Sequence, residues 1–217
     1  LLQRCVPLLH EFHQLESEFS AYSGAVRCRL AGPALLQLKW GGLLSKALSS
    51  IYPEAQFHFG NQDECSALLA LEQGEVDAAL VTSAISPESV AGYESCTLGH
   101  ISWAIASGAE HPLQKGFGAL ELDTVLSYQF VVPYQAHFQA LKSGFATDGW
   151  RDDLYPRRIL YRSHDLLLVD GLVRRNMALA YLPEYVLAEL GLYAVELEQN
   201  LQQQELDVCL WYRPSRS

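Results

Sequence analysis

The sequence has no long apolar run and no surplus of basic charge. None of its 217 residues belongs to a stretch of roughly 18 consecutive apolar positions, the length that spans a bilayer. The start also lacks the basic, apolar and small-residue series of a signal peptide. We therefore expect a cytoplasmic protein without a membrane partner. The formal net charge is -10. Because phosphate binding needs a basic face, we do not expect this chain by itself to bind DNA.

Cysteine is scarce and irregularly spaced. The five cysteines lie at positions 5, 28, 65, 96 and 209, with no CxxC pair and an odd count. This pattern favours a reduced protein whose cysteines are small buried hydrophobic residues. A cysteine redox switch remains an alternative. No cysteine lies between residues 97 and 208, however, so that part of the chain could not supply an internal disulfide.

Signatures of catalysis and metal binding are also missing. The sequence has no GxSxG elbow, no P-loop and no HExxH, and GFGALE, which begins at residue 116, is not a GxGxxG loop. His10 and His13 could share a helix face, but two such ligands without a carboxylate or cysteine partner are a weak metal site. SHD at residues 163–165 is explained more simply if Ser163 caps the helix that follows. We expect no catalytic residue, no metal and no cofactor.

Arginine is concentrated in the last third of the chain. Five arginines, at positions 157, 158, 162, 174 and 175, could together hold an anion. Such a set is more often a solvated face with local ion pairs, and this is our expectation.

The chain opens with a helical heptad pattern. Apolar residues recur at spacings of 4, 3, 4, 3 and 4, and the pattern stops at Ser23-Gly24. Residues 1–24 are therefore predicted to form a linker helix, started or kinked at Pro7, that packs against a helix from a second copy. The chain begins without Met and part-way through this repeat, so we expect a fragment of a longer protein. The seam residues are Leu1, Cys5, Leu8, Phe12, Leu15 and Phe19.

After this helix, strand and helix patterns alternate. A first series covers strands at 26–31, 57–59 and 76–81 and helices at 35–51 and 64–73, the second of which closes at Gly74. A second series covers strands at 129–133, 157–162 and 178–182 and helices at 136–142, 166–175 and 184–190. Strands separated by helices predict parallel sheets with right-handed crossovers, and so an α/β protein. Two long β-like segments, 100–106 and 206–213, are well placed to cross between two lobes. The predicted order is a linker helix at 1–24, a first lobe at 25–102, a second lobe at 103–205 and a return to the first lobe at 206–217.

Four segments, taken in order, resemble the regulatory portion of a LysR-type transcriptional regulator. The end of the family's linker helix and its first strand resemble EFHQLESEFSAYSGAVRCRLAG, and its helix, glycine and strand segment resembles ALEQGEVDAAL. Its crossover strand resembles WAIASGAEHPL, and its late helix and Leu-Pro segment resemble LVRRNMALAYLPEYV. Asn176 and Ala178 replace glycines of the late turn, although asparagine tolerates a left-handed backbone. The first loop, Gly32-Pro33-Ala34, offers no hydroxyl, and the family's C-terminal helix does not follow before Ser217.

The resemblance implies a two-lobed fold like that of type II periplasmic binding proteins, preceded by the linker helix. It implies an effector-sensing regulatory domain that binds a small molecule between the lobes and alters the geometry of a DNA-bound oligomer. DNA would be bound only through an N-terminal winged helix-turn-helix that is absent from this chain. The implied partners are an anionic or partly apolar effector and a second copy, with a tetramer at full length. An antiparallel homodimer is expected through helix 35–51, which has more apolar positions than one lobe face needs.

The effector is expected beyond the carboxyl ends of the parallel strands, where doubly wound sheets bind ligands. Thr82, Ser83, Gln135 and His137 are expected to supply polar contacts, together with free amides at helix starts, which favour anions. We therefore expect a small, partly apolar molecule with one polar or acidic end. The full predicted effector-binding set is Gly32, Pro33, Ala34, Asn61, Gln62, Thr82, Ser83, Tyr134, Gln135, Ala136, His137 and His164.

Two alternative functions use a similar scaffold. A stand-alone solute-binding protein of the same fold is disfavoured by the heptad start and the missing signal peptide. An enzyme on a related two-lobed scaffold would need a convergent set of titratable groups, which the sequence does not offer.

Overall fold

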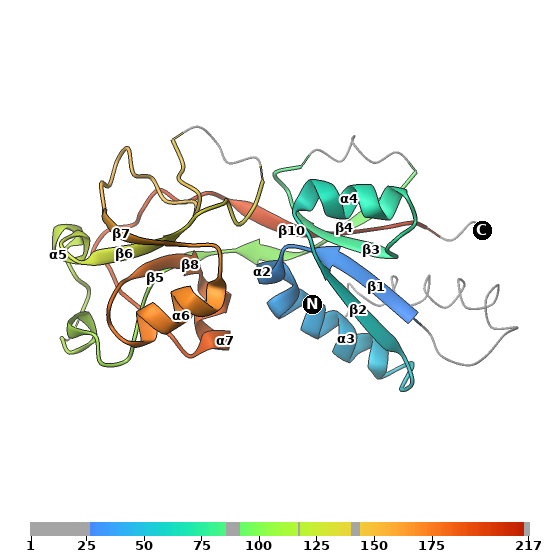
Figure 1. The fold of residues 1–217 in the computed structure, drawn as a ribbon, viewed down its shortest axis with the longest axis horizontal. Coiled ribbons are helices and arrows are strands. Elements are labelled where there is room, and N and C mark those ends of the chain that lie inside the picture. The colour runs from blue at the N-terminus through green and yellow to red at the C-terminus, as the bar shows by residue number, and fades with distance from the viewer. Residues whose placement is uncertain (1–26, 86–91, 117, 140–143, 215–217) are drawn as a thin grey trace, which may run out of the picture. The chain divides into compact units, whose positions relative to one another are not determined.

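The computed structural model describes residues 27–85, 92–116, 118–139 and 144–214 (Figure 1). The predicted linker helix at 1–24 and its heptad seam lie outside these residues. The chain divides into two compact units, one made of Leu1–His100 and Leu206–Ser217 and the other of Ile101–Glu205. The first unit is thus assembled from two parts of the chain that are far apart in sequence.

A five-stranded sheet forms the centre of the first unit. Its strands are β1 (Arg27–Gly32), β2 (Gln56–Asn61), β3 (Ala78–Thr82), β4 (Glu94–Ile101) and β10 (Leu206–Tyr212), in the order β2-β1-β3-β10-β4. Strands β1, β2 and β3 run parallel, whereas β10 is antiparallel to β3. The carboxyl ends of the three parallel strands therefore lie at the same edge, with Gly32 opposite Asn61. This confirms the parallel arrangement predicted for the first strand and helix series.

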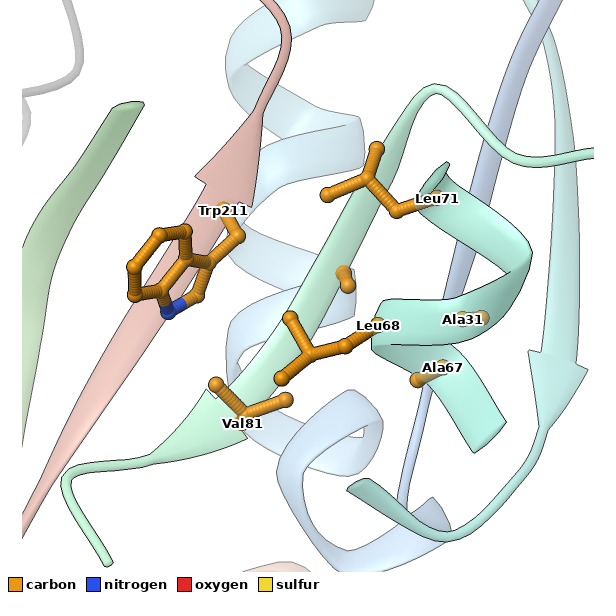
Figure 2. Packing of buried hydrophobic residues seen from close by; sticks show 7 residues of the cluster. Ala31, Ala67, Leu68, Leu71, Val81 and Trp211 are labelled. Carbon is orange, nitrogen blue, oxygen red and sulfur yellow. The ribbon is translucent and has the colours of Figure 1, made fainter. Parts of the chain in front are cut away.

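Helix α4 (Glu64–Glu72) packs on this sheet through small and branched apolar residues. Figure 2 shows the cluster, in which leucines from the helix meet side chains of β1, β3 and β10. All five residues of β3 are buried. A strand covered on both faces has no solvent side to alternate with, which explains its continuous apolar run. The members of the cluster are Ala31, Ala67, Leu68, Leu71, Ala79, Val81 and Trp211.

The helix predicted at 35–51 is an unbroken helical segment over residues 34–49, with a π-helical part in it. Its parts are α2 (Ala34–Leu36), the π-helical η1 (Gln37–Gly41) and α3 (Gly42–Ser49). The side-chain amide of Gln37 donates to the carbonyl oxygens of Gly32, at 2.5 Å, and Gly60, at 2.7 Å. The start of the π-helical part is thus tied to the ends of β1 and β2.

In its described residues, the second unit contains a three-stranded sheet, β8-β5-β9, and a parallel pair, β6-β7. The strands are β5 (Trp103–Ser107), β6 (Gln129–Pro133), β7 (Arg158–Ser163), β8 (Ala180–Pro183) and β9 (Tyr193–Ala194). The helices are η3 (Pro112–Gln114), α5 (Leu122–Leu126), α6 (Leu166–Arg174) and α7 (Glu184–Leu190). An isolated bridge between Phe130 and Leu179 connects β6 to the residue just before β8.

An ion pair is buried in the core of the second unit. Arg157 donates to both oxygens of Asp148, at 2.6 and 3.0 Å, and also to Asp152, at 2.9 and 3.2 Å. The side chains of Arg157 and Asp148 are 0% exposed. The guanidinium lies over the rings of Phe130 and Trp150, at 5.4 and 5.1 Å. The expectation of a solvated arginine face is therefore wrong for Arg157, which is an internal cation.

The prediction of a helix at 136–142 is wrong for the positions that the structure describes. Residue 136 has no regular structure, residues 137–139 form bends, and the remaining positions lie outside the described residues. The N–H of His137 donates to the carbonyl of Thr147 at 3.2 Å, and the Thr147 hydroxyl donates to the carbonyl of Pro133 at 2.8 Å. Pairing with a later segment thus replaces the hydrogen bonds of a helix.

Ser163 does not cap helix α6, contrary to the prediction. Asp165 is the cap, because its carboxylate accepts from the N–H of Leu167 at 2.8 Å. The Ser163 hydroxyl instead accepts from the N–H of Asp165 at 2.9 Å, which closes a short turn before the helix.

The left-handed turns expected at Gly74 and Asn176 are present, whereas the burial expected for the cysteines is found only in part. Gly74 has φ 74° and Asn176 has φ 57°, as expected from residues that tolerate this conformation. Among the described cysteines, Cys28 is buried but Cys65 is exposed, so the expectation that all are buried is wrong.

Candidate functional site

The carboxyl ends of β1 and β2 are joined by backbone and side-chain hydrogen bonds. The N–H of Ala34 donates to Asn61 Oδ1 at 3.1 Å, and the N–H of Gln62 donates to the Gly32 carbonyl at 3.1 Å. Gly32 has φ 153°, and a Cβ there would lie 2.4 Å from the Leu80 carbonyl oxygen. A glycine is therefore required where β1 enters the loop. The structure thus brings four of the predicted residues together at this edge, and Pro33 lies between two of them.

A carboxylate is buried against the end of β3. Glu64, the first residue of α4, is 0% exposed and Thr82 is 1% exposed. Glu64 Oε1 accepts from the Thr82 N–H at 2.5 Å and from the Thr82 hydroxyl at 2.6 Å. The next residue, Ser83, donates its N–H to the Asp207 carbonyl at 2.8 Å and accepts the Asp207 N–H on its hydroxyl at 3.0 Å. Both predicted hydroxyl contacts therefore already have partners within the first unit.

The helix starts carry their own acceptors. Asp63 caps α4 and accepts from the Ser66 N–H at 3.0 Å and from the Ser66 hydroxyl at 2.6 Å. These hydrogen bonds lower the pKa of Asp63 below its ordinary value, and the bond from the Ser66 side chain has the largest effect. Asp165 caps α6 in the same way, and Asn61 accepts the first N–H of α2. At each of these helix starts, one amide that was expected to attract an anion is thus bound by an oxygen of the chain itself.

The ends of β6 and β7 bring the second set of predicted residues together. The N–H of Tyr134 donates to the Ser163 carbonyl at 3.0 Å, and the Tyr134 ring stacks on His164 with centroids 4.8 Å apart and planes at 17°. Tyr134 is 59% exposed. Gln135, Ala136 and His164 are exposed as well. This edge of the second unit therefore presents an accessible aromatic pair beside a free amide side chain.

His137 differs from its exposed neighbours. Its side chain is only partly exposed, and its ring lies 6.5 Å from that of Phe138. Burial lowers the pKa of His137 to about 4, against an opposing effect of the Asp148 charge. At neutral pH this residue is therefore an uncharged imidazole and offers no positive charge to an anion.

Sequence reasoning missed Gln37 and Glu64, the two side chains that organise the carboxyl ends of the parallel strands in the first unit. An acid in the first turn of a helix is common because it interacts favourably with the helix dipole, and it usually faces solvent. Nothing in the sequence around Glu64 separates a buried acid from an exposed one. The contact with Thr82, 18 residues later, is a tertiary feature.

The described residues contain neither a cluster of metal-ligand side chains nor a helix suited to span a membrane. Across residues 27–85, 92–116, 118–139 and 144–214, no group of three or more His, Cys, Asp or Glu side chains is arranged to hold a metal ion. The helices in this part of the chain also lack the combined length and apolar character that crossing a membrane requires.

Solved structures share this fold at low sequence identity. One is the C-terminal domain of a probable LysR family transcriptional regulator from Rhodococcus sp. RHA1, at 19% identity and TM-score 0.62, with 88% of this chain and 91% of that chain covered. Another is the BenM effector binding domain with its effector benzoate, at 17% identity and TM-score 0.64, with 90% and 86% covered. A third is the effector binding domain of QuiR in complex with shikimate, at 14% identity and TM-score 0.61, with 90% of each chain covered.

The family itself is shown by sequence. No curated protein matches the chain. The family model described as the LysR substrate binding domain, however, matches residues 25–217. That match includes both units, and the mixed α/β fold with its two units is the periplasmic-binding-protein-like fold of these regulators. The chain therefore belongs to the LysR substrate binding domain family, a family of transcriptional regulator domains and not a class of enzymes.

Proposed function

We propose that this chain is the effector-sensing regulatory domain of a bacterial LysR-type transcriptional regulator. It binds a small molecule at the carboxyl ends of its parallel strands, and DNA is bound by a winged helix-turn-helix outside this sequence. The observation that carries the proposal is the family match over residues 25–217, which contains the carboxyl ends of the parallel strands in both units. A net charge of -10 supports a DNA-binding surface that lies on another module.

The size of the effector is suggested by relatives of the same fold. The BenM and QuiR domains are described with benzoate and shikimate, both small ring compounds. In this chain, the exposed stack of Tyr134 on His164 offers a surface for a flat or apolar group, and Gln135 beside it offers a hydrogen-bonding amide. We therefore propose a small, partly apolar effector with one polar end.

The effector acts by linkage and no bond is made or broken. A ligand that binds one arrangement of the oligomer more tightly shifts the population toward that arrangement. Coupling between two sites is typically about 1–3 kcal/mol, or roughly 5- to 150-fold in affinity. The Gln37 amide supports a route for this coupling, because it joins the ends of β1 and β2 to the helical segment 34–49.

That helical segment is also the proposed dimer contact. Leu38, Leu43 and Ile51 are 38%, 45% and 45% exposed, and Phe59 of the edge strand β2 is 49% exposed. A contiguous exposed apolar patch marks a contact with another protein, and Leu38, Leu43 and Ile51 lie in or just after this helical segment. We propose that they pack in an antiparallel homodimer, and that the full-length protein is a tetramer.

The test is a ligand screen on the 217-residue chain followed by localisation. A ligand present at about 100 times its Kd stabilises the folded state by about 2.7 kcal/mol, which a thermal shift detects. Amide chemical shifts should then change at residues 32, 34, 82–83 or 134–137. Gln135→Ala should weaken the hit, and Tyr193→Ala, at another exposed tyrosine of the second unit, should not. Binding with shifts confined to residues outside both strand edges would contradict the proposed site.

A further inference from the structure

One residue of the second unit, Thr147, is bonded to both ends of the exposed segment 134–136. The Thr147 hydroxyl donates to the carbonyl of Pro133, just before the segment, at 2.8 Å. The Thr147 carbonyl accepts the N–H of His137, just after the segment, at 3.2 Å. Pro133 is buried, whereas the three residues between these two hydrogen bonds are all exposed. The two bonds therefore fix the backbone that carries the proposed effector contacts of the second unit.

Thr147 is followed by Asp148, which is fixed in the core of the second unit. The Asp148 side chain is 0% exposed, and its two oxygens accept from Arg157 at 2.6 and 3.0 Å. Asp148 Oδ1 also accepts from the N–H of Trp150 at 3.3 Å. A displacement of this backbone would separate a buried ion pair, which is strongly unfavourable. Thr147 is therefore held from the core side and can in turn hold the exposed segment.

The segment has a second support at the end of β7. The N–H of Tyr134 donates to the Ser163 carbonyl at 3.0 Å, and the Tyr134 ring stacks on His164 with centroids 4.8 Å apart. All these contacts are made by the chain itself, so the segment is ordered without a ligand. A site that is ordered in advance avoids the cost of fixing its loop and side chains during binding.

We propose that Thr147 is a positioning residue, which holds segment 134–136 in its binding conformation before an effector arrives. This inference rests on the proposed effector function and adds that the second-unit part of the site is preformed. The net contribution of one hydrogen bond corresponds to a factor of roughly two to ten in a population. Exposed loops open at little cost in free energy, so removing the Thr147 hydroxyl lowers the fraction of chains with an ordered segment. The apparent affinity for an effector falls with that fraction.

The test combines backbone order parameters of the free 217-residue chain with the affinity for benzamide, a probe with a flat ring and one polar end. In the free parent, residues 134–136 should have order parameters of about 0.85, the value of rigid backbone. Thr147→Val keeps the side-chain shape and removes the hydroxyl. It should lower these order parameters and weaken benzamide binding roughly two- to tenfold. Thr147→Ser keeps the hydroxyl and should restore both values.

A control variant separates positioning from overall stability. Val195 is buried elsewhere in the second unit, and Val195→Ala should lower the stability of the unit while leaving both readouts unchanged. Order parameters below about 0.6 in the free parent would overturn the inference, and so would a Thr147→Val protein that matches the parent in either readout. Absence of benzamide binding to the parent at millimolar concentration would count against the proposed effector chemistry. The order parameters of the free chain would then still decide whether Thr147 holds the segment.

Discussion

Replacing Arg157 by Met should destabilise the second unit more than any surface charge change. The substitution leaves the Asp148 carboxylate 0% exposed and without its cation, whereas Asp152 is 35% exposed and stays in contact with water. Removing one partner of a buried ion pair costs about 3–5 kcal/mol. The exposed i,i+4 pair between Arg174 and Asp170 provides a matched control, since such a pair contributes only about 0.3–0.5 kcal/mol.

The assay is urea unfolding combined with hydrogen exchange of the β6 and β7 amides, which reports on the second unit alone. Arg157→Met should lose about 3–5 kcal/mol and Arg174→Met less than about 1 kcal/mol. Arg157→Met combined with Asp148→Leu should recover much of the loss, because no uncompensated buried charge then remains. An Arg157→Met protein within about 1 kcal/mol of the parent would refute the assignment of Arg157 as a buried, paired cation.

Three further outcomes are expected. Gly32→Ala should cost about 1–3 kcal/mol of stability because its Cβ would meet a β3 carbonyl oxygen at 2.4 Å. Gly42→Ala, which adds a Cβ into open space in a helix, should be neutral or stabilise by up to about 1 kcal/mol. Thermal melts that rank the two variants equally would contradict this. Leu43→Glu should convert a dimer to monomers in sedimentation while Ser49→Glu does not, and a monomeric parent would rule out this contact. The pKa of His137 is lowered from 6.5 to about 4 in the folded state, so the unfolded chain binds more protons between these values. Stability is then complete above pH 6.5 and should fall by up to about 3 kcal/mol toward pH 4, and His137→Gln should flatten this dependence.

The regular elements with a strong local pattern were predictable from sequence. Strand β6 was predicted at 129–133 and helix α7 at 184–190, which are the observed bounds. In α7 the reason is local, since Gly191 ends the helix with φ 62°. The strand predicted at 100–106 covers most of β5 but only the last two residues of β4, which begins at residue 94. Its residues are largely exposed, so no alternation of apolar and polar residues marks it.

The candidate site also has features that the sequence predicted and features that it did not. The position of each strand end follows from the strand pattern, and parallel pairing then brings Gly32 and Asn61 together. The state of each side chain depends on partners from other segments, which no local pattern reveals. Thr82 looked like a free hydroxyl and is bound to Glu64, and Arg157 looked solvated and is enclosed with Asp148. Residue type therefore predicted where the strand ends meet better than it predicted the partners of their side chains.

The place of β10 in the first sheet bears on the order in which the protein can fold as it is synthesised. β10 lies between β3 and β4, and Val208 pairs with Thr82. While the ribosome is still making residues 101–205, β3 and β4 have no strand between them, and the facing edge of each is open to pairing with another chain. The second unit is continuous in sequence and can finish folding before residue 206 emerges. The first unit starts earlier and is completed later, so a chain cut before Leu206 should leave a completed second unit beside an aggregation-prone first sheet.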